Sequence, residues 1–326
     1  MQMTSNQTGS GRLPLRLGVL DLVPQAEGAT AEQAVSEAVL LARLAERSGY
    51  ERYWAAEHHD LPGLACAAPE VLLAHIGAVT RHIRLGTGAL LLPHYSPLKV
   101  AETFRLLAAL NPGRMDLGIG RAPGGPAHAS MALSGNFLQR VYGMEQSVQA
   151  LIELLDGTYA YEGQPVQAKP VPAVEPELWM LGTASKSAVY AAQNGCGFVF
   201  GAFMSDEDPA KVLASYREAF VPSKRLAEPK TMMAVGIFCA DTSAEAAKLA
   251  RDSSRDNARP ETPVQAPRKH QVQGTAEEAV AMLKQWQRAY NNEEFLVMTP
   301  SWNYEARRRS FELLGKCLQN MEQGLL

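Results

Sequence analysis

The sequence predicts a (β/α)8 TIM barrel. Two observations support this fold class: eight strand-like apolar runs alternate with amphipathic helical segments, and no internal repeat of solenoid length is present. A chain of 326 residues falls within the range of α/β barrels that fold as one unit, so a second domain is not required. A doubly wound sheet is the alternative fold class.

The first half of the chain predicts four strand-helix units. The expected strands are 15–21, 52–57, 82–93 and 114–120. The expected helices start at Thr30, near Pro69, at Ser96-Pro97 and near Phe137, and the last continues to Leu155. Thr30 and Gln33 form a capping box, and proline is favoured in a first helical turn.

The second half continues the same alternation. The expected strands are 177–183, 196–203, 231–240 and 294–299. The expected helices are 185–195, 206–220, 242–253, 275–290 and 304–321. Two further capping boxes, Thr242 with Glu245 and Thr275 with Glu278, set two of these helix starts.

Three segments do not fit the alternation. The proline-rich stretch 159–176 predicts an insertion loop or short hairpin after the fourth unit. The stretch 255–272 has mixed charge and almost no apolar periodicity, so we expect a mobile lid there. Residues 1–13 are expected to be a flexible tail, which leaves 14–326 as a single barrel domain.

The composition favours small-molecule chemistry. A net charge of -3 without blocks of like charge gives no electrostatic footprint for nucleic acid or an anionic membrane surface. No apolar run approaches the roughly 18 residues of a membrane span. The four cysteines are widely spaced and form no C-x-x-C pair, which argues against a zinc knuckle or disulfide framework and fits a cytoplasmic protein.

In a barrel of this kind the active site lies at the C-terminal ends of the strands. Several strand ends should therefore converge on one face. They are Asp21, 57–59, 86–89, 120–121, 181–185, 201–202 and Thr299.

The stretch YWAAEHHD, residues 53–60, places Glu57, His58 and His59 at one of these ends. Adjacent residues of an extended chain point to opposite sides, so the two histidines cannot chelate one metal from one strand face. A histidine at a barrel mouth suits acid-base chemistry, because its ordinary pKa lies near neutral pH. The alternative is a structural role, in which one histidine pairs with Glu57 or a backbone carbonyl.

The stretch GIGRAPGG, residues 118–125, suggests a dinucleotide site, but Pro123 stands where the Rossmann fingerprint requires a third glycine. Arg121 is more informative. An arginine at the end of an apolar strand reaches solvent, pairs with a carboxylate or holds an anion.

Two further strand ends carry small residues. In GTASKSA, residues 182–188, a helix N-terminus could bind phosphate, or Thr183 or Ser185 could simply cap the helix. In GTGALLLP, residues 86–93, small residues could admit a flat ligand or mark a bulge.

Four motifs together resemble the bacterial luciferase-like flavin monooxygenases, in particular single-chain members outside the light-emitting group. They are YWAAEHH, IRLGTGALLLPHYSPLKVAE, LNPGRMDLGIGRAPGG and WMLGTASKSA. The match runs in order from about residue 15 to 205 and more loosely through 274–299. It implies a (β/α)8 barrel that binds FMN at its C-terminal mouth, usually as a homodimer.

The resemblance also implies roles for individual residues. His58 would be the acid/base near the flavin-oxygen adduct, with His59 and Glu57 as support. Gly88 and Ala89 would form a non-prolyl cis peptide beneath the isoalloxazine ring, which Leu20 would face. Arg121 would contact the flavin phosphate. Thr183 to Ser187 would form the phosphate loop, and Leu181, Thr183, Ala184, Ser185 and Ser187 are expected to bind the cofactor. Gly120, Thr183 and Gly125-Pro126 depart from the light-emitting members, so light emission is not expected.

The implied reaction oxygenates a small organic substrate: the enzyme would act on paired donors, the substrate and reduced FMN, with O2 as the oxidant. Reduced FMN, supplied by a separate flavin reductase that binds transiently, would form a C4a-hydroperoxide with O2, sheltered by the 255–272 lid. Two alternatives stay open: a deazaflavin (F420)-dependent oxidoreductase on the same barrel, and a non-catalytic flavin-binding protein. No metal, nucleic acid or membrane partner is expected.

Overall fold

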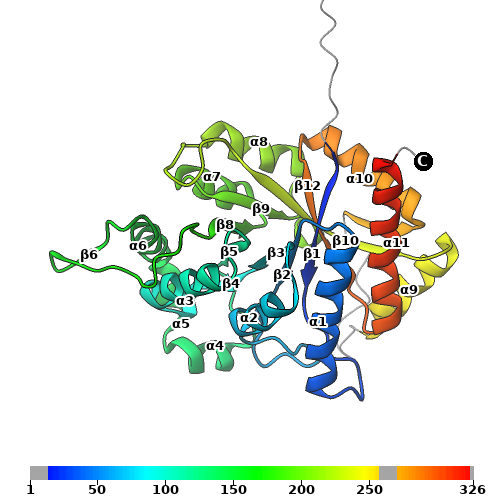
Figure 1. Cartoon of the computed structure of the whole chain (residues 1–326), viewed down its shortest axis with the longest axis horizontal. Helices are drawn as coiled ribbons and strands as arrows, with labels where there is room; N and C mark the ends of the chain where they lie inside the picture. The colour runs from blue at the N-terminus through cyan, green and yellow to red at the C-terminus, as the bar shows by residue number, and fades with distance from the viewer. Residues whose placement is uncertain (1–13, 257–269, 324–326) are drawn as a thin grey trace, which may run out of the picture.

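The computed structural model describes residues 14–256 and 270–323. Within this part of the chain, eight parallel strands close into a barrel with helices around it, which confirms the predicted fold class (Figure 1). The barrel strands are β1 (Arg16–Asp21), β2 (Arg52–Ala55), β3 (Arg84–Thr87), β5 (Met115–Gly120), β8 (Glu177–Gly182), β9 (Gly197–Gly201), β10 (Thr231–Cys239) and β12 (Glu294–Met298).

Strand pairing closes the barrel between its first and last strands. Leu17 of β1 pairs with Phe295 of β12, and β10 lies between β12 and β9. All of these pairs are parallel, as expected when each strand is followed by a helix that returns the chain to the same edge. Because β1 and β12 are neighbours, we propose that residues 14–326 act as one domain.

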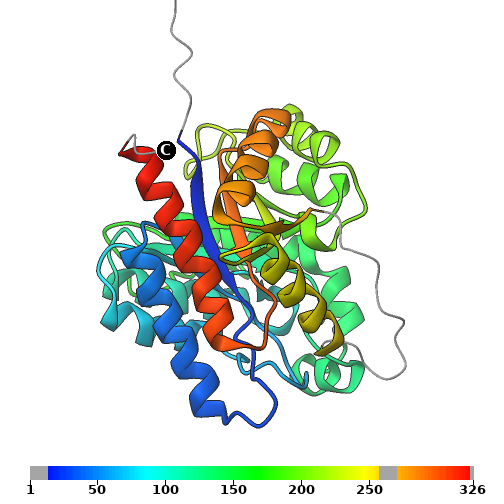
Figure 2. The ribbon, with the colours of Figure 1, turned by 90° about the vertical axis from the view of Figure 1, so that its right-hand side faces the viewer.

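The helices form the outer layer. They are α1 (Ala31–Arg47), α2 (Pro69–Val79), α3 (Pro97–Leu110), α4 (Ala127–Ser134), α5 (Phe137–Tyr142), α6 (Met144–Asp156), α7 (Ser185–Gln193), α8 (Pro209–Ala219), α9 (Ser243–Asp256), α10 (Ala276–Tyr290) and α11 (Tyr304–Glu322). The capping boxes at Thr30, Thr242 and Thr275 are all present. The last helix, α11, lies beside the first, α1 (Figure 2).

Two tryptophans fill the barrel interior, and glycines on neighbouring strands make room for them. A Cβ atom on Gly86 would lie 2.5 Å from Trp54 Nε1, and one on Gly197 would lie 2.3 Å from Trp179 Cε3. The two indole rings contact each other edge to face at 6.1 Å between centroids. A side chain at either glycine would therefore displace an indole from the packed interior.

Buried charges occupy the N-terminal end of the barrel below these rings. Asp116 accepts hydrogen bonds from Arg52 Nη1 at 2.7 Å, Arg84 Nη2 at 2.5 Å and Trp54 Nε1 at 2.9 Å. Arg52 also pairs with Glu294. We call this group of buried charges the floor of the barrel. Each charge in the floor faces an opposite charge, which offsets the cost of removing it from water.

Several predicted boundaries were wrong. The run 82–93 is not one strand, because β3 ends at Thr87 and a two-residue strand β4 (Leu90–Leu91) and a 3-10 helix η1 (Leu92–His94) follow. The expected helix 137–155 is broken at Gly143 into α5 and α6. The helix α4 and a strand β11 (Gln271–Gly274), which pairs with β10 outside the barrel, were not predicted.

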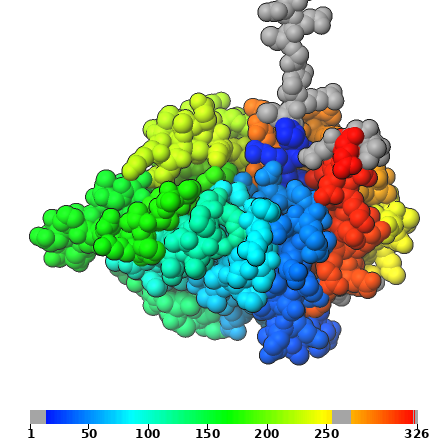
Figure 3. All heavy atoms as spheres, in the orientation of Figure 1, coloured from blue at the N-terminus to red at the C-terminus, as the bar shows by residue number. Residues whose placement is uncertain are grey.

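The proline-rich insertion is present as predicted. It contains a two-stranded hairpin of β6 (Ala160–Tyr161) and β7 (Gln164–Pro165). The hairpin projects from the body of the molecule (Figures 1 and 3). Residues 257–269 of the expected lid and the expected tail 1–13 lie outside the described residues.

Candidate functional site

A cavity of about 2060 Å³ opens at the C-terminal ends of the barrel strands. It receives residues from the ends of β1, β5, β8, β9 and β12 and from the turn after β3. All of the predicted site residues except His59 line it, namely Leu20, Glu57, His58, Gly88, Ala89, Arg121, Leu181, Thr183, Ala184, Ser185 and Ser187. The predicted convergence of strand ends on one face is therefore confirmed for these positions.

Asp21 and Thr299 were also expected at this face, but neither lines the cavity. Asp21 is buried and accepts hydrogen bonds from Tyr53 Oη at 2.7 Å and Arg307 Nη2 at 2.6 Å. Thr299 donates from its hydroxyl to the carbonyl of Ile237 at 2.8 Å. Both side chains are used to hold strand ends in place.

The turn after β3 forms a bare patch in the cavity wall. Gly88 and Ala89 are joined by a non-prolyl cis peptide bond, as the family resemblance implied. A Cβ atom on Gly88 would lie 2.5 Å from Leu20 Cδ1, so a side chain at this position would require Leu20 to move. The patch offers backbone and one methyl group to a ligand, next to the apolar side chain of Leu20.

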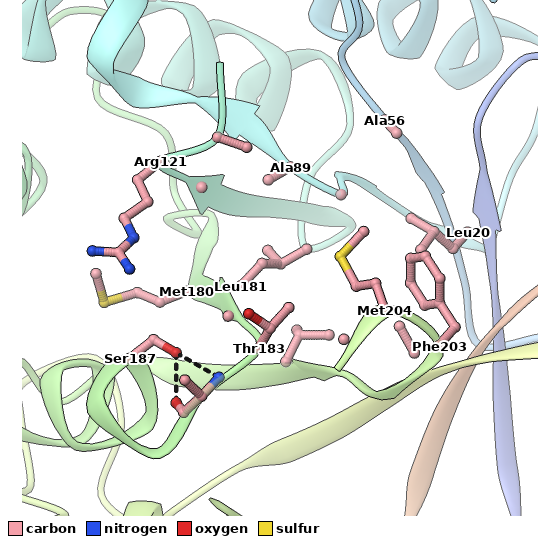
Figure 4. Close-up of a pocket in the computed structure, with 18 of the residues that line it drawn as sticks. Leu20, Ala56, Ala89, Arg121, Met180, Leu181, Thr183, Ser187, Phe203 and Met204 are labelled. Carbon is pink, nitrogen blue, oxygen red and sulfur yellow. Dashed lines mark hydrogen bonds between the residues drawn. The ribbon is translucent and has the colours of Figure 1, made fainter. Parts of the chain in front are cut away.

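The end of the cavity that lies away from Leu20 is polar. Arg121 and Ser187 lie at this end, whereas Leu20 and Phe203 lie at the other, with Ala89 and Leu181 between them (Figure 4). Arg121 is exposed and makes no ion pair with any residue that the structure describes. The alternative that Arg121 forms a salt bridge in the barrel mouth is not observed, and its guanidinium is free to bind an anion.

The N-terminus of α7 does not have the predicted cap. Its N-cap residue is Ala184, and the Ser187 hydroxyl accepts from the Ala184 N–H at 3.3 Å. Neither Thr183 nor Ser185 caps the helix. Instead, the N–H and the hydroxyl of Ser185 both donate to Glu207 Oε2, at 2.9 and 2.7 Å.

The side chain of His58 lines the cavity just beyond the end of β2. Its backbone N–H donates to the carbonyl of Cys66 at 2.9 Å, and its Nδ1 is buried without a hydrogen-bond partner among the described residues. Burial lowers the pKa of His58 to about 4, and the neighbouring His59 contributes in the same direction. The imidazole is therefore neutral at neutral pH.

His59 and Glu57 form a pair on the other side of the chain. His59 Nε2 lies 2.7 Å from Glu57 Oε1, which confirms that one of the two histidines pairs with Glu57. Glu57 is buried and also accepts from Tyr95 Oη and from the Leu91 N–H, both at 2.9 Å. Within the part of the chain that the structure describes, Glu57 bonds to His59 and no hydrogen bond joins it to the His58 ring.

The glycines of GRAPGG, residues 120–125, pack against the loop that carries His58 and His59, which we call the histidine loop. The carbonyl of Gly124 accepts from the His59 N–H at 2.9 Å, and a Cβ on Gly125 would lie 2.1 Å from the His59 carbonyl oxygen. The small residues thus permit two strand-end loops to meet. This contact accounts for them without a dinucleotide.

Sequence reasoning missed several residues in and beside the site. Phe203 and Met204 line the cavity from a 3-10 helix, η2 (Ala202–Met204), that was expected to be the end of a strand. Glu207 follows in the same loop. The general rule that barrel loops after strands build the site could have identified this loop, but no local motif marks it.

Two classes of site are not found. Within residues 14–256 and 270–323, no group of three or more His, Cys, Asp or Glu side chains is arranged to hold a metal ion. In the same part of the chain no helix has both the length and the apolar character needed to cross a membrane.

Comparison with known proteins agrees with this geometry. Residues 15–309 match the family model of the luciferase-like monooxygenases. An N-acetyl-S-alkylcysteine monooxygenase of Bacillus subtilis (strain 168) is 34% identical, over 92% of this chain and 97% of its own. The oxygenase component of a flavin-dependent trigonelline monooxygenase from Acinetobacter baylyi is 25% identical, over 68% of this chain and 64% of its own.

A solved structure extends the agreement to the fold. The crystal structure of apo-MsnO8 superposes with a TM-score of 0.80 at 33% identity, covering 94% of this chain and 98% of that one. The barrel, the position of the cavity and the family match point in the same direction. The chain therefore belongs to the luciferase-like monooxygenase family.

Proposed function

We propose that this chain is an FMN-dependent monooxygenase that uses reduced FMN and O2 to oxygenate a small organic substrate. The observation that carries the proposal is the layout of one cavity. Three features face the same space: a bare, flat patch at Gly88 and Ala89, the half-buried imidazole of His58, and the Arg121 guanidinium, which has no ion-pair partner among the described residues.

The residues present fit a flavin mononucleotide. The Gly88-Ala89 backbone and Leu20 would hold the flat ring, because a side chain at position 88 would clash with Leu20. Arg121, the α7 N-terminus and Ser187 would hold the phosphate, since helix ends and arginine both favour anions. The Ser187 hydroxyl, which donates to the Ala184 carbonyl at 2.7 Å, would turn toward the phosphate. When bound, reduced flavin supplies the electrons and the activation of O2.

His58 would act on the reacting groups as a neutral imidazole. Its pKa of about 4 keeps it unprotonated at neutral pH, so it can accept a proton or donate a hydrogen bond from its single N–H. Glu57 and His59 would act as positioning residues. Glu57 ties the histidine loop to Leu91, two residues after Ala89, and so fixes His58 relative to the bare patch.

Apolar side chains on the far side of the cavity would shield the reaction from water. Leu20, Phe203 and Met298 line the cavity there. Exclusion of water strengthens the polar interactions that remain and protects reactive species from hydrolysis. The substrate is expected to occupy this apolar end.

The wider setting is also part of the proposal. A separate reductase would supply the reduced flavin, as suggested by the relative described as an oxygenase component. We expect a homodimer and a cytoplasmic location, the latter because all four cysteines are free thiols.

Flavin titration followed by a reductase-coupled oxygen assay tests the function. The screen should include aldehydes, aromatic polyketide-like compounds and N-acetyl-S-alkylcysteines, the last named for a relative's substrate. Substrate-dependent O2 consumption with FMN is the expected result. Oxygen-independent turnover with F420 would replace the proposal with hydride transfer, and tight FMN binding without either activity would indicate a non-catalytic flavoprotein.

A further inference from the structure

The phosphate end of the cavity already contains carboxylates. Glu207 accepts two hydrogen bonds from Ser185 at the N-terminus of α7, where a flavin phosphate would find its donors. These bonds hold the pKa of Glu207 below its usual range, so the carboxylate is ionised at neutral pH. Glu145, in the first turn of α6, lines the cavity itself.

The cations at this end are accompanied by these carboxylates. Arg121 and Lys186 line the cavity, and neither forms an ion pair with a residue in the described ranges. Glu145 lines the cavity with them, and Glu207, which also interacts with Lys211, lies beside it at the N-terminus of α7, so negative charge is already present where an incoming dianion would bind. A site that retains a phosphate permanently gains from unopposed positive charge, whereas this one does not.

The position of Glu207 is held by the loop around it. Its N–H donates to the Ser205 hydroxyl at 3.1 Å, and that hydroxyl donates to the Thr183 carbonyl at 2.6 Å. The loop after β9 is thus fastened to the loop after β8 at two points. The carboxylate is a fixed feature of the helix end rather than a freely rotating surface group.

We infer that Glu207 and Glu145 weaken the binding of the flavin phosphate, so that FMN is exchanged between turnovers instead of being retained. This inference rests on the proposed function and adds a property to it. Rapid exchange suits a protein that receives reduced flavin from another protein. The two glutamates would set how long each flavin stays.

The test compares FMN with riboflavin, which lacks the phosphate. Oxidised FMN and riboflavin are titrated against the wild-type protein, Glu207→Gln and Glu145→Gln at low ionic strength, with flavin fluorescence as the readout. Glutamine keeps an oxygen that can accept from Ser185 but removes the charge. We expect Glu207→Gln to bind FMN about three- to tenfold more tightly, from the loss of one charge near a dianion.

The other results follow from the same reasoning. Riboflavin affinity should be unchanged, the gain for Glu145→Gln should be smaller, and both gains should shrink in high salt. Stopped-flow displacement should show slower FMN release from Glu207→Gln. Glu153→Gln is the matched control, because Glu153 lies on α6 outside the cavity and bonds to Gln149 at 2.8 Å.

Unchanged or weaker FMN binding by a folded Glu207→Gln protein, judged by its thermal melt, would overturn the inference while leaving the proposed function intact. A wild-type protein that binds neither flavin would instead remove the proposed function, and the inference with it.

Discussion

The two ends of the barrel use the same kinds of side chain in opposite ways. At the N-terminal floor, Arg52 and Asp116 are buried and fully engaged with each other and with Trp54. At the C-terminal mouth, Arg121 is exposed without an ion pair among the described residues, and His58 Nδ1 is buried without a partner. The floor uses its charges for the fold, whereas the mouth keeps its polar groups available for a ligand.

The largest expected effect tests the floor. Asp116→Ala would leave Arg52 Nη1 and the Trp54 N–H without their acceptor inside the barrel, and Arg52 would keep Glu294 as its remaining partner. Removing one partner of a buried ion pair costs about 3 to 5 kcal/mol of unfolding free energy. Urea denaturation measures this loss. A loss below about 1 kcal/mol, typical of an exposed pair, would show that the floor is not the stabilising unit described here.

Arg121→Ala tests the C-terminal mouth, where we expect a loss of ligand binding and no loss of stability. We expect FMN affinity to fall about ten- to hundredfold, because charge-assisted hydrogen bonds contribute roughly 1.5 to 3 kcal/mol. Riboflavin affinity and the urea midpoint should stay unchanged. Arg43→Ala is the control, since Arg43 is exposed on α1 and does not line the cavity. Equal losses for FMN and riboflavin would contradict a phosphate contact.

His58→Ala separates chemistry from binding. Product formation should be abolished while FMN remains bound, and reoxidation of reduced flavin without product should accelerate. Single-turnover absorbance and product analysis measure both. His59→Ala should retain more activity, because His59 faces Glu57 rather than the cavity. Undiminished product formation by His58→Ala would remove its role.

The pH profile sharpens this assignment. Because the pKa of His58 is lowered to about 4, its protonation should not reduce the single-turnover rate near the ordinary histidine pKa of about 6.5. The His58-dependent loss should appear only as the pH falls toward 4. Comparison with His58→Gln identifies that component, and a loss near the ordinary value that disappears in His58→Gln would contradict the neutral, buried imidazole.

The smallest effect is expected at Tyr95. Tyr95→Phe removes one of the hydrogen bonds that Glu57 accepts but keeps the ring. We expect a loss of about 1 kcal/mol in unfolding free energy and a modest decrease in kcat. Urea denaturation and steady-state kinetics check this. A large rise in KM for FMN would place Tyr95 in the binding site instead.

Most of the fold could be predicted because its signals are local. The residues that form each signal, such as Thr30 and Gln33 of the capping box, lie within a few positions of each other in the sequence. The break after Thr87 was missed because residues 85–93 are all either small or apolar, as in a buried strand. Strand β11 was missed because QVQG has a single large apolar residue and becomes a strand only by pairing with β10.

The site residues that could be predicted were those at the ends of barrel strands and those that the family resemblance implied. The opposite facing of His58 and His59 follows from backbone alternation alone. The bond from Ser185 to Glu207 joins residues 22 positions apart in different loops, and no spacing rule connects them. The contact of Tyr95 with Glu57, 38 positions apart, has the same character.

The most direct test of the account is a crystal structure of the protein with FMN bound. The account predicts that the ring lies on the Gly88-Ala89 backbone beside Leu20, with the phosphate between Arg121 and Ser187 and His58 facing the ring. A flavin bound elsewhere, or one whose phosphate points away from Arg121 and α7, would contradict it.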